Sequence, residues 1–309
     1  MTWPLRPGDT VALVAPAGPV TVEKLAAGAA VLESWGLRVR RATGLLARHP
    51  QLPYLAGTDA ERARDFTEAW LDPEVTAVFA ARGGYGCPRV LDLLDWEALR
   101  QAPPTLFAGS SDTTALHDAV GARLGLPTLF CPMPATSYFD AAAAAHLRAT
   151  LFEPGTVRVL TGPEAGPLVP GRAEGRLVGG NLSLLAAGAG TPGTRPARDG
   201  IAVLEDVGEE PYRIDRMLTQ LLRAGWFAGV RGIVLGSWTG CGDPRAVREV
   251  LRDRLGPLGV PVLCGLRFGH CPSALTVPLG VPAELDAAAA RVVVRQRRGP
   301  GDVSSSCRS

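Results

Sequence analysis

The sequence lacks any long hydrophobic stretch. Its 309 residues are 46% hydrophobic, but they contain no run of about 18 consecutive apolar residues, so we predict no membrane-spanning helix. The segment "TVALVAPAG" near the N-terminus is too short for the apolar region of a signal peptide and indicates a first strand and turn. We therefore expect a cytoplasmic protein with no membrane partner.

The sequence also lacks a strong net charge and the common nucleotide-binding motifs. Lys and Arg total 32 and Asp and Glu total 30, for a formal net charge of +2. No strong basic field is present, so no nucleic-acid partner is predicted. The turn "GGYGCPR" lacks the third glycine of the dinucleotide fingerprint, and no Walker motif occurs, which disfavours a non-enzymatic nucleotide-binding module.

Cysteines are few and unpaired in sequence. None of the six belongs to a C-x-x-C pair, which disfavours a zinc ribbon. Cys264, His270 and Cys271 lie close together, but no second ligand cluster accompanies them, so we predict no metal site. Isolated thiols in a cytosolic chain are usually small buried apolar groups.

The first 125 residues alternate short apolar runs with helical patterns. The apolar runs predict strands at 10–17, 37–43, 75–84 and 104–112, and the 3.6-residue periodicity predicts helices at 21–36, 59–72 and 113–125. This order predicts an α/β fold with a Rossmann/flavodoxin-like parallel sheet. Ligands bind such sheets at the carboxyl ends of the strands, where both "ARGGYG" and "GSSD" fall.

A segment rich in Pro and Gly divides the chain. We predict an N-terminal domain at 1–152, a linker at 153–173, a C-terminal domain at 174–296 and a disordered tail at 297–309. The C-terminal domain is expected to be a smaller α/β unit with a mixed sheet. Its predicted elements are a helix after the glycine turn of "EGRLVGGNLSLLAAGAG", strands at 200–206, 231–238, 260–265, 274–280 and 290–296, and helices at 212–225 and 244–256.

Residues 106–117, "LFAGSSDTTALH", place two serines where a strand turns into a helix. A serine at such a turn presents its hydroxyl beside backbone N–H groups, which suits a nucleophile next to half an oxyanion hole. The alternative is that Ser110, Ser111 or Asp112 only caps the following helix. Taken alone, this stretch favours the cap.

A nucleophilic serine needs a base and an orienting carboxylate. His270 lies in a glycine-flanked loop before a strand, whereas His117 follows Ser111 by six residues on the helix and should point away. Glu205 closes an apolar strand, where a carboxylate is costly unless it is paired or faces a cleft. The alternatives are a surface histidine and a solvent-facing acid.

The blocks around these residues resemble the LD-carboxypeptidases, serine peptidases of murein recycling, and the related microcin C immunity peptidases. The resemblance extends from about residue 4 to residue 296. It implies Ser111 as nucleophile, Glu205 as acid and His270 as base, in the cleft between the domains. It rests on the blocks "GDTVALVAPAGPV", "ARGGYGCPRVLDLLD", "GSSDTTALH", "EGRLVGGNLSLLAAGAGTP", "LEDVGEEPYRIDRMLTQL" and "GHCPSALTVPLG".

The resemblance also implies the remaining parts of the site. The oxyanion hole would use the backbone N–H groups of Asp112 and of the "RGG" turn, where Gly84 is favoured over Gly83. The free carboxylate of an exopeptidase substrate is expected to meet Arg82, or Arg213 and Arg216. For the last two the alternative is pairing with Glu209, Glu210 or Asp215 on the helix surface. Gly83 and Asn181 are further expected substrate-binding residues. Two departures from the family pattern affect the expected pocket wall: Ser110 replaces an aromatic residue, and "FCPM" at 130–133 replaces His-Gly-Pro-Met.

The implied reaction is hydrolysis of the terminal D-alanine from murein tetrapeptide or a similar small peptide, without metal or cofactor, by a protein that forms a homodimer. One alternative is a microcin C-type immunity peptidase that cleaves peptidyl or aminoacyl nucleotide amides. Such an enzyme needs an aromatic residue to stack on the base, and the run after "GGNLSLLAAGAGTP" lacks one. An α/β-hydrolase is disfavoured because "GSSDT" is not G-x-S-x-G.

Overall fold

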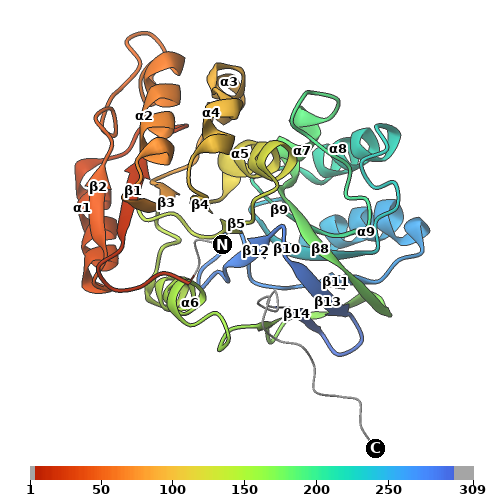
Figure 1. Cartoon of the computed structure of the whole chain (residues 1–309). Helices are drawn as coiled ribbons and strands as arrows, with labels where there is room; N and C mark the ends of the chain where they lie inside the picture. The colour runs from red at the N-terminus through yellow and green to blue at the C-terminus, as the bar shows by residue number, and fades with distance from the viewer. Residues whose placement is uncertain (1–3, 296–309) are drawn as a thin grey trace, which may run out of the picture.

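The strands of the N-terminal half build a parallel sheet. A computed structural model describes residues 4–295 (Figure 1), and its first sheet has six strands in the order β12-β5-β4-β3-β1-β2. Five of them run parallel: β1 (Thr10–Val14), β2 (Arg38–Arg41), β3 (Val75–Ala80), β4 (Leu106–Gly109) and β5 (Thr128–Phe130). The predicted Rossmann/flavodoxin-like sheet is confirmed.

Helices cover both faces of this sheet because its strands are apolar on both sides. Val11 and Leu13 of β1 contribute to one core cluster, whereas Ala12 and Val14 contribute to the other. The helical elements of this half are α1 (Val22–Ser34), α2 (Asp59–Leu71), α3 (Cys87–Val90), α4 (Trp96–Gln101), α5 (Thr114–Ala119) and α6 (Ala141–Phe152), with 3₁₀ turns at Leu91–Leu93 and Ser111–Thr113 and a π-helical segment at Val120–Leu124.

A capping box begins α2 where the sequence predicts the helix. The Thr58 hydroxyl accepts the Glu61 N–H at 3.2 Å, and the Thr58 N–H donates to the Glu61 carboxylate at 2.7 Å. These two hydrogen bonds satisfy the backbone N–H groups of Thr58 and Glu61, which have no acceptor within the first turn of the helix. The predicted helix at 59–72 therefore appears with nearly the predicted bounds.

The second sheet is mixed. Its eight strands lie in the order β6-β14-β13-β8-β9-β10-β11-β7, and only the four from β8 to β11 run parallel. The strands are β6 (Val159–Thr161), β7 (Gly166–Val169), β8 (Arg172–Asn181), β9 (Gly200–Val207), β10 (Gly232–Thr239), β11 (Val262–Cys264), β13 (Pro282–Asp286) and β14 (Arg291–Val294). The expected mixed sheet is confirmed.

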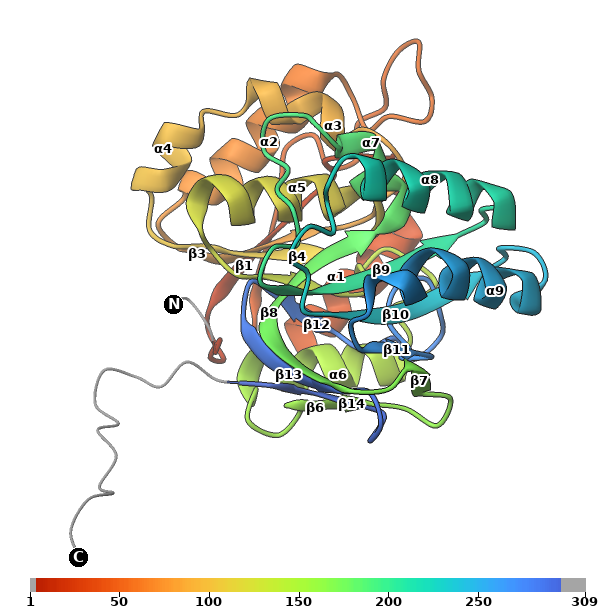
Figure 2. The same cartoon turned by 90° about the vertical axis from the view of Figure 1, so that its right-hand side faces the viewer.

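Three helices accompany this sheet: α7 (Leu182–Gly188), α8 (Pro211–Arg223) and α9 (Pro244–Leu255), followed by a 3₁₀ turn at Gly256–Leu258. Helices α8 and α9 lie side by side along it (Figure 2). Ile214, Met217, Leu218 and Leu221 of α8 are buried in the core, as their spacing predicts.

The two sheets are joined by a strand from late in the chain. β12 (Val277–Leu279) pairs antiparallel with β5 of the first sheet, and the Phe130 and Phe268 rings meet edge to face at 6.2 Å in the adjoining core. The predicted linker at 153–173 carries β6 and β7, which form opposite edges of the second sheet. The domain bounds drawn from the sequence stay a prediction.

The predicted tail at 297–309 lies outside the described residues. Between residues 4 and 295, the helices are all too short or too polar to span a bilayer. Over the same range, no three His, Cys, Asp or Glu side chains are grouped so that they could hold a metal ion.

Candidate active site

Ser111 has an uncommon backbone conformation. It follows β4, opens the 3₁₀ turn Ser111–Thr113 and has a φ of 62°. A left-handed backbone at a residue other than glycine costs of order 1–3 kcal/mol and often marks a functional site. The sharp turn from strand to helix is the geometry that exposes a nucleophilic hydroxyl.

A glycine loop lies directly against this turn. A Cβ atom at position 83 would lie 2.9 Å from the Ser111 Cβ and 3.1 Å from its Oγ. The loop therefore approaches Ser111 this closely only because residue 83 has no side chain. The loop is held from its other side, where the Gly18 N–H donates to the Gly83 carbonyl at 3.0 Å. Gly84 follows with a φ of 114°.

The Asp112 carboxylate joins the two loops. Its Oδ2 accepts the Cys87 N–H at 2.7 Å, and its burial raises the pKa of this carboxyl. The alternative that Ser110, Ser111 or Asp112 only caps the following helix is wrong, because no side chain among the described residues caps the 3₁₀ turn Ser111–Thr113 or α5. The polar residues of the turn hold loop against loop instead.

Glu205 and His270 form a buried pair. Glu205 lies within β9 with no exposed surface, and its Oε2 is 2.8 Å from His270 Nδ1. The same oxygen accepts the His270 backbone N–H at 3.1 Å. The alternatives of a solvent-facing acid and a surface histidine are therefore wrong. Arg213 lies 3.6 Å from the Glu209 carboxylate and not beside Glu205.

Gly269 makes this pairing possible. Its φ is 90°, and a Cβ atom on it would lie only 2.2 Å from the Glu205 Oε2. The carboxylate therefore occupies the space that a side chain at position 269 would need. The glycine before His270, which the sequence analysis treated only as part of a motif, has a physical role at the site.

The environment of His270 favours its protonated form. Burial alone lowers the pKa of the imidazole, but the hydrogen bond and charge of Glu205, together with the charge of Asp206, raise this pKa above its ordinary value. With Nδ1–H held toward the carboxylate, Nε2 is the nitrogen left to act as a base. The Tyr138 ring meets the imidazole edge to face at 5.7 Å.

Asn181 connects the two neighbouring acids. Its Nδ2 donates to Glu205 Oε1 at 3.1 Å and to Asp206 Oδ1 at 2.9 Å, while its Oδ1 accepts from the Ser183 hydroxyl at 2.6 Å. The residue is only 2% exposed. These contacts engage the side chain within the protein and hold its amide beside Glu205. The expected substrate-binding role of Asn181 stays a prediction.

Asp206 is a second acid that the sequence analysis did not single out. Burial raises the pKa of this carboxyl to about 6. Its oxygens accept the N–H groups of Val207 at 2.8 Å and Ser183 at 2.9 Å, besides the amide of Asn181. In the sequence, only its position directly after Glu205 indicated that Asp206 could belong to the site. Its contacts with Asn181 and Ser183 form because β8 lies beside β9.

A hydrogen bond ties this acid network to the helix that follows Ser111. The Asn181 backbone N–H donates to the hydroxyl of Thr114, the first residue of α5, at 3.0 Å. Contacts therefore run without a gap from α5 through Asn181 and Glu205 to His270. Among residues 4–295, no hydrogen bond joins the Ser111 hydroxyl to His270, and such contacts often tighten only when substrate binds.

Arg82 borders an open cavity of about 450 Å³ beside Gly84. One guanidinium N–H donates to the Pro19 carbonyl at 2.7 Å. No carboxylate in the described part of the chain lies within 4 Å of this arginine, so its other N–H groups are not engaged by an acid. The cavity is lined by Gly18, Pro19, Pro53, Tyr54, Arg82, Gly84 and Tyr85.

The other histidines have structural contacts. His117 is buried with Nε2 3.0 Å from the Gly109 carbonyl, and burial lowers its pKa to about 4. His146 Nδ1 accepts the Thr276 N–H at 3.1 Å. His49 Nδ1 accepts two backbone N–H groups of its own loop. His270 is the histidine that meets an acid.

The departures from the family pattern lie in the interior. Phe130 and Cys131 are fully buried at the end of β5, and burial raises the pKa of the Cys131 thiol to about 12. Ser110 is 6% exposed and has an extended backbone. The smaller side chain at 110 is therefore buried directly before the turn that carries Ser111.

Comparisons with known proteins agree along the chain. Family models match it twice, as an LD-carboxypeptidase N-terminal domain over residues 11–131 and as an LD-carboxypeptidase C-terminal domain over residues 174–285. A Streptomyces coelicolor protein named as a carboxypeptidase is 59% identical over 286 residues, which are 92% of each chain.

Two further similarities concern substrates. The murein tetrapeptide carboxypeptidase of Pseudomonas aeruginosa is 35% identical, over 92% of this chain and 95% of its own. The structure of MccF in complex with glutamyl sulfamoyl guanosine matches with a TM-score of 0.83 and 26% identity, over 95% of this chain and 98% of that one. The chain is thus similar both to a protein named for a murein peptide and to a protein solved with a nucleoside ligand.

Proposed function

Because the chain belongs to the LD-carboxypeptidase family and is a carboxypeptidase, we propose that it hydrolyses the terminal D-alanine from murein tetrapeptide with Ser111, Glu205 and His270. One observation carries this proposal: the left-handed Ser111 turn is tied through Asn181 to the buried Glu205–His270 pair. The 35% identity to a murein tetrapeptide carboxypeptidase supports the substrate.

In the first half of the reaction, His270 Nε2 takes the proton of the Ser111 hydroxyl. The Ser111 Oγ attacks the carbonyl carbon of the bond to D-alanine, and the carbonyl oxygen becomes an oxyanion. We assign the donation to this oxyanion to the N–H groups of Asp112 and Gly84, which lie in the two loops that the Cys87–Asp112 hydrogen bond joins. Removing one such donor typically costs about 10²–10³ in rate.

In the second half, the bond to the leaving amine breaks and the amine takes the proton from His270. A water molecule then gives a proton to His270 and attacks the acyl–Ser111 carbonyl. The acyl–Oγ bond breaks, His270 returns its proton to the Ser111 Oγ, and the shortened peptide leaves with a new carboxylate. Glu205 accepts the Nδ1–H throughout, so that the imidazole alternates between base and acid without turning.

An exopeptidase must also hold the free carboxylate of its substrate. We assign this to Arg82, which lies one residue before Gly83 and has no acidic partner within 4 Å in the described chain. Arg213 pairs with Glu209, and the Arg216 guanidinium lies 5.9 Å from the Tyr212 ring. Because each has a partner in or next to its own helix, we favour Arg82 for the substrate carboxylate. Planar guanidinium groups bind carboxylates with two parallel hydrogen bonds.

A microcin C-type immunity peptidase is the second candidate, since MccF shares the fold and binds glutamyl sulfamoyl guanosine. One local feature favours it: the exposed rings of Tyr54 and Tyr85 lie 6.0 Å apart beside Arg82. Exposed aromatic rings can stack on a base. The segment between α7 and β9 offers no aromatic residue for that purpose.

One experiment separates the candidates. The protein is incubated with murein tetrapeptide and, separately, with an aminoacyl sulfamoyl adenosine, and the released D-alanine and nucleoside are quantified. We expect D-alanine release that is lost in Ser111→Ala and retained in Ser110→Ala. Release at the wild-type rate by Ser111→Ala would refute the nucleophile, and cleavage of only the nucleotide substrate would favour the second candidate.

The expected homodimer and cytoplasmic location also remain proposals. Sedimentation of the purified chain measures its oligomeric state, and fractionation of cells shows the compartment in which it is found. A monomer over the working range of concentration would contradict the proposed assembly.

A further inference from the structure

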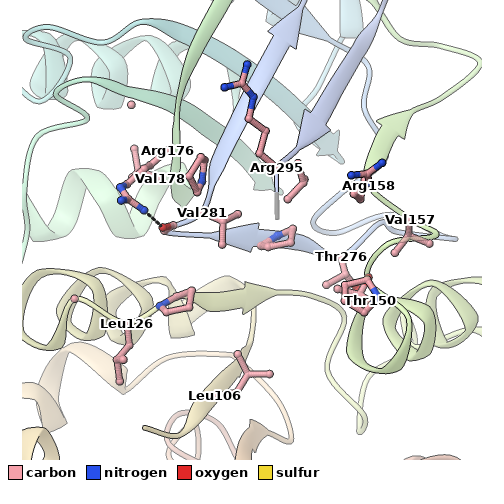
Figure 3. Close-up of a pocket in the computed structure, with 18 of the residues that line it drawn as sticks. Leu106, Leu126, Thr150, Val157, Arg158, Arg176, Val178, Thr276, Val281 and Arg295 are labelled. Atoms are coloured by element: carbon pink, nitrogen blue, oxygen red, sulfur yellow. Dashed lines mark hydrogen bonds between the residues drawn. The ribbon is translucent and has the colours of Figure 1, made fainter. Parts of the chain in front are cut away.

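A large groove lies at the other end of the strands from Ser111. It encloses about 980 Å³ and is lined by the residues that start β4 and β5, by β8, and by the segments around 153–158 and 195–200 (Figure 3). β12 contributes Pro278 to the lining, and Gly280 follows that strand. Nothing in the proposed reaction uses this groove.

The groove and the candidate active site are separated by the length of a strand. Leu106, the first residue of β4, lines the groove, whereas Ser111 follows the last residue of the same strand. Five residues at about 3.3 Å each place the two roughly 16 Å apart. A ligand in the groove therefore lies outside the reach of the nucleophile.

The wall of the groove is apolar and rigid. Val178, Val281 and Leu106 lie among the residues that line it, and several proline rings accompany them. Proline fixes its own φ, so such a wall needs little ordering when a ligand binds. The lining prolines are Pro4, Pro104, Pro127, Pro154, Pro196, Pro278 and Pro282.

The charges along the groove are mostly positive. Five arginines line it, against the two carboxylates of Glu153 and Asp199. Asp199 is already paired with Arg231, which lies outside the lining. Arg295 likewise pairs with Glu174 and Glu284. The lining arginines are Arg158, Arg176, Arg195, Arg198 and Arg295.

Four of these arginines form no ion pair. Within residues 4–295, no carboxylate lies within 4 Å of Arg158, Arg176, Arg195 or Arg198. Burial raises the pKa of Asp118, although the charge of Arg195 acts to lower it. Arg176 donates to the Gly280 carbonyl at 2.8 Å, and Figure 3 shows it across the groove from Arg158. Cations gathered around one concave surface raise the local potential and attract anions.

We propose that this groove binds a small amphipathic anion, with an apolar body on the valine and proline wall and a phosphate or carboxylate group on the arginines. The volume lies in the range of small-molecule sites, which are usually apolar with a few convergent polar groups. Guanidinium groups favour phosphate and carboxylate over neutral heads because they donate two parallel hydrogen bonds. The site is separate from the peptidase centre.

Calorimetric titration with monomeric dodecyl phosphate tests this inference. We expect one molecule to bind per chain, and binding about tenfold or more weaker in Arg158→Gln/Arg176→Gln. The matched control is Arg38→Gln, on β2 at the far edge of the first sheet, which should bind as the wild type does. Equal thermal unfolding of the three proteins excludes misfolding.

Two probes of related chemistry complete the test. A neutral dodecyl ether and inorganic phosphate should each bind much more weakly than dodecyl phosphate, because each offers one half of the ligand. Equal affinity for the neutral ether, unchanged affinity in the double variant, or binding only to anionic vesicles would overturn the proposal. The proposal would also be overturned if dodecyl phosphate and murein tetrapeptide competed for binding to Ser111→Ala, because the probe would then lie in the candidate active site.

Discussion

His270 Nδ1 lies 2.8 Å from Glu205 Oε2, and the same oxygen also accepts the His270 backbone N–H at 3.1 Å. One carboxylate oxygen thus fixes both the position of the loop and the orientation of the ring. Because Glu205 has no exposed surface, this hydrogen-bonded pairing compensates for a carboxylate that is costly to bury alone.

This pairing predicts the titration of His270. In Ser111→Ala, NMR should give a His270 pKa above its ordinary value, because Glu205 and Asp206 outweigh burial. Adding Glu205→Gln removes the carboxylate and leaves burial, the largest single effect, opposed only by the charge of Asp206, so this pKa should fall. A His270 pKa that is unchanged by Glu205→Gln would contradict the pairing.

Gly269→Ala should disrupt the pair through the backbone. The new Cβ would lie 2.2 Å from Glu205 Oε2, and a misplaced acid–base pair typically costs about 10²-fold in kcat. We also expect a loss of about 1–3 kcal/mol in the free energy of unfolding. Steady-state kinetics and thermal unfolding measure the two effects.

Gly259→Ala is its matched control. Gly259 also has a positive φ, of 67°, but a Cβ there meets nothing within 4 Å. This variant should lose some stability and keep its activity. Equal activity losses in the two variants would show that strain alone, and not contact with Glu205, causes the effect.

Gly83→Ala tests the approach of the glycine loop to Ser111. Its Cβ would lie 2.9 Å from the Ser111 Cβ, so the loop or the turn must move. We expect kcat to fall by about 10²-fold. Gly166→Ala, where a Cβ meets nothing within 4 Å, should keep the wild-type rate. A fully active Gly83→Ala would separate this loop from the reaction.

Periodicity located most of the elements that carry the candidate site. The alternation of apolar runs and helices gave β4, β9 and α5 close to their true bounds, because local packing patterns decide where such elements form. The segment 153–173 was different. Its prolines and glycines hid β6 and β7, which form only because they pair with the edges of a distant sheet.

The contacts of the site depended on the tertiary fold. Glu205 and His270 are 65 residues apart, so their pairing came from family resemblance and not from spacing. The role of Asn181 could not be predicted, because its amide meets Glu205 and Asp206 only where β8 lies beside β9. A sequence places such an asparagine at a turn without indicating which groups it contacts.

Asn181→Ala distinguishes a positioning role from substrate binding. Without its amide, Glu205 Oε1 loses a hydrogen bond at 3.1 Å, and losing a bond to a charged group is worth roughly 10–100-fold. We expect this loss in kcat with little change in KM for murein tetrapeptide. A rise in KM at constant kcat would instead restore the expected contact between Asn181 and the substrate.

His117 predicts how stability depends on pH. Burial lowers its pKa from 6.5 to about 4, so the unfolded chain binds more protons than the folded chain between these values. The free energy of unfolding should therefore fall as pH drops from 6.5 toward 4, by roughly 3 kcal/mol from this residue. His117→Gln, which keeps a donor for the Gly109 carbonyl, should remove that contribution. Denaturant unfolding at pH 7 and pH 4.5 measures the difference, and an equal pH dependence in both proteins would contradict it.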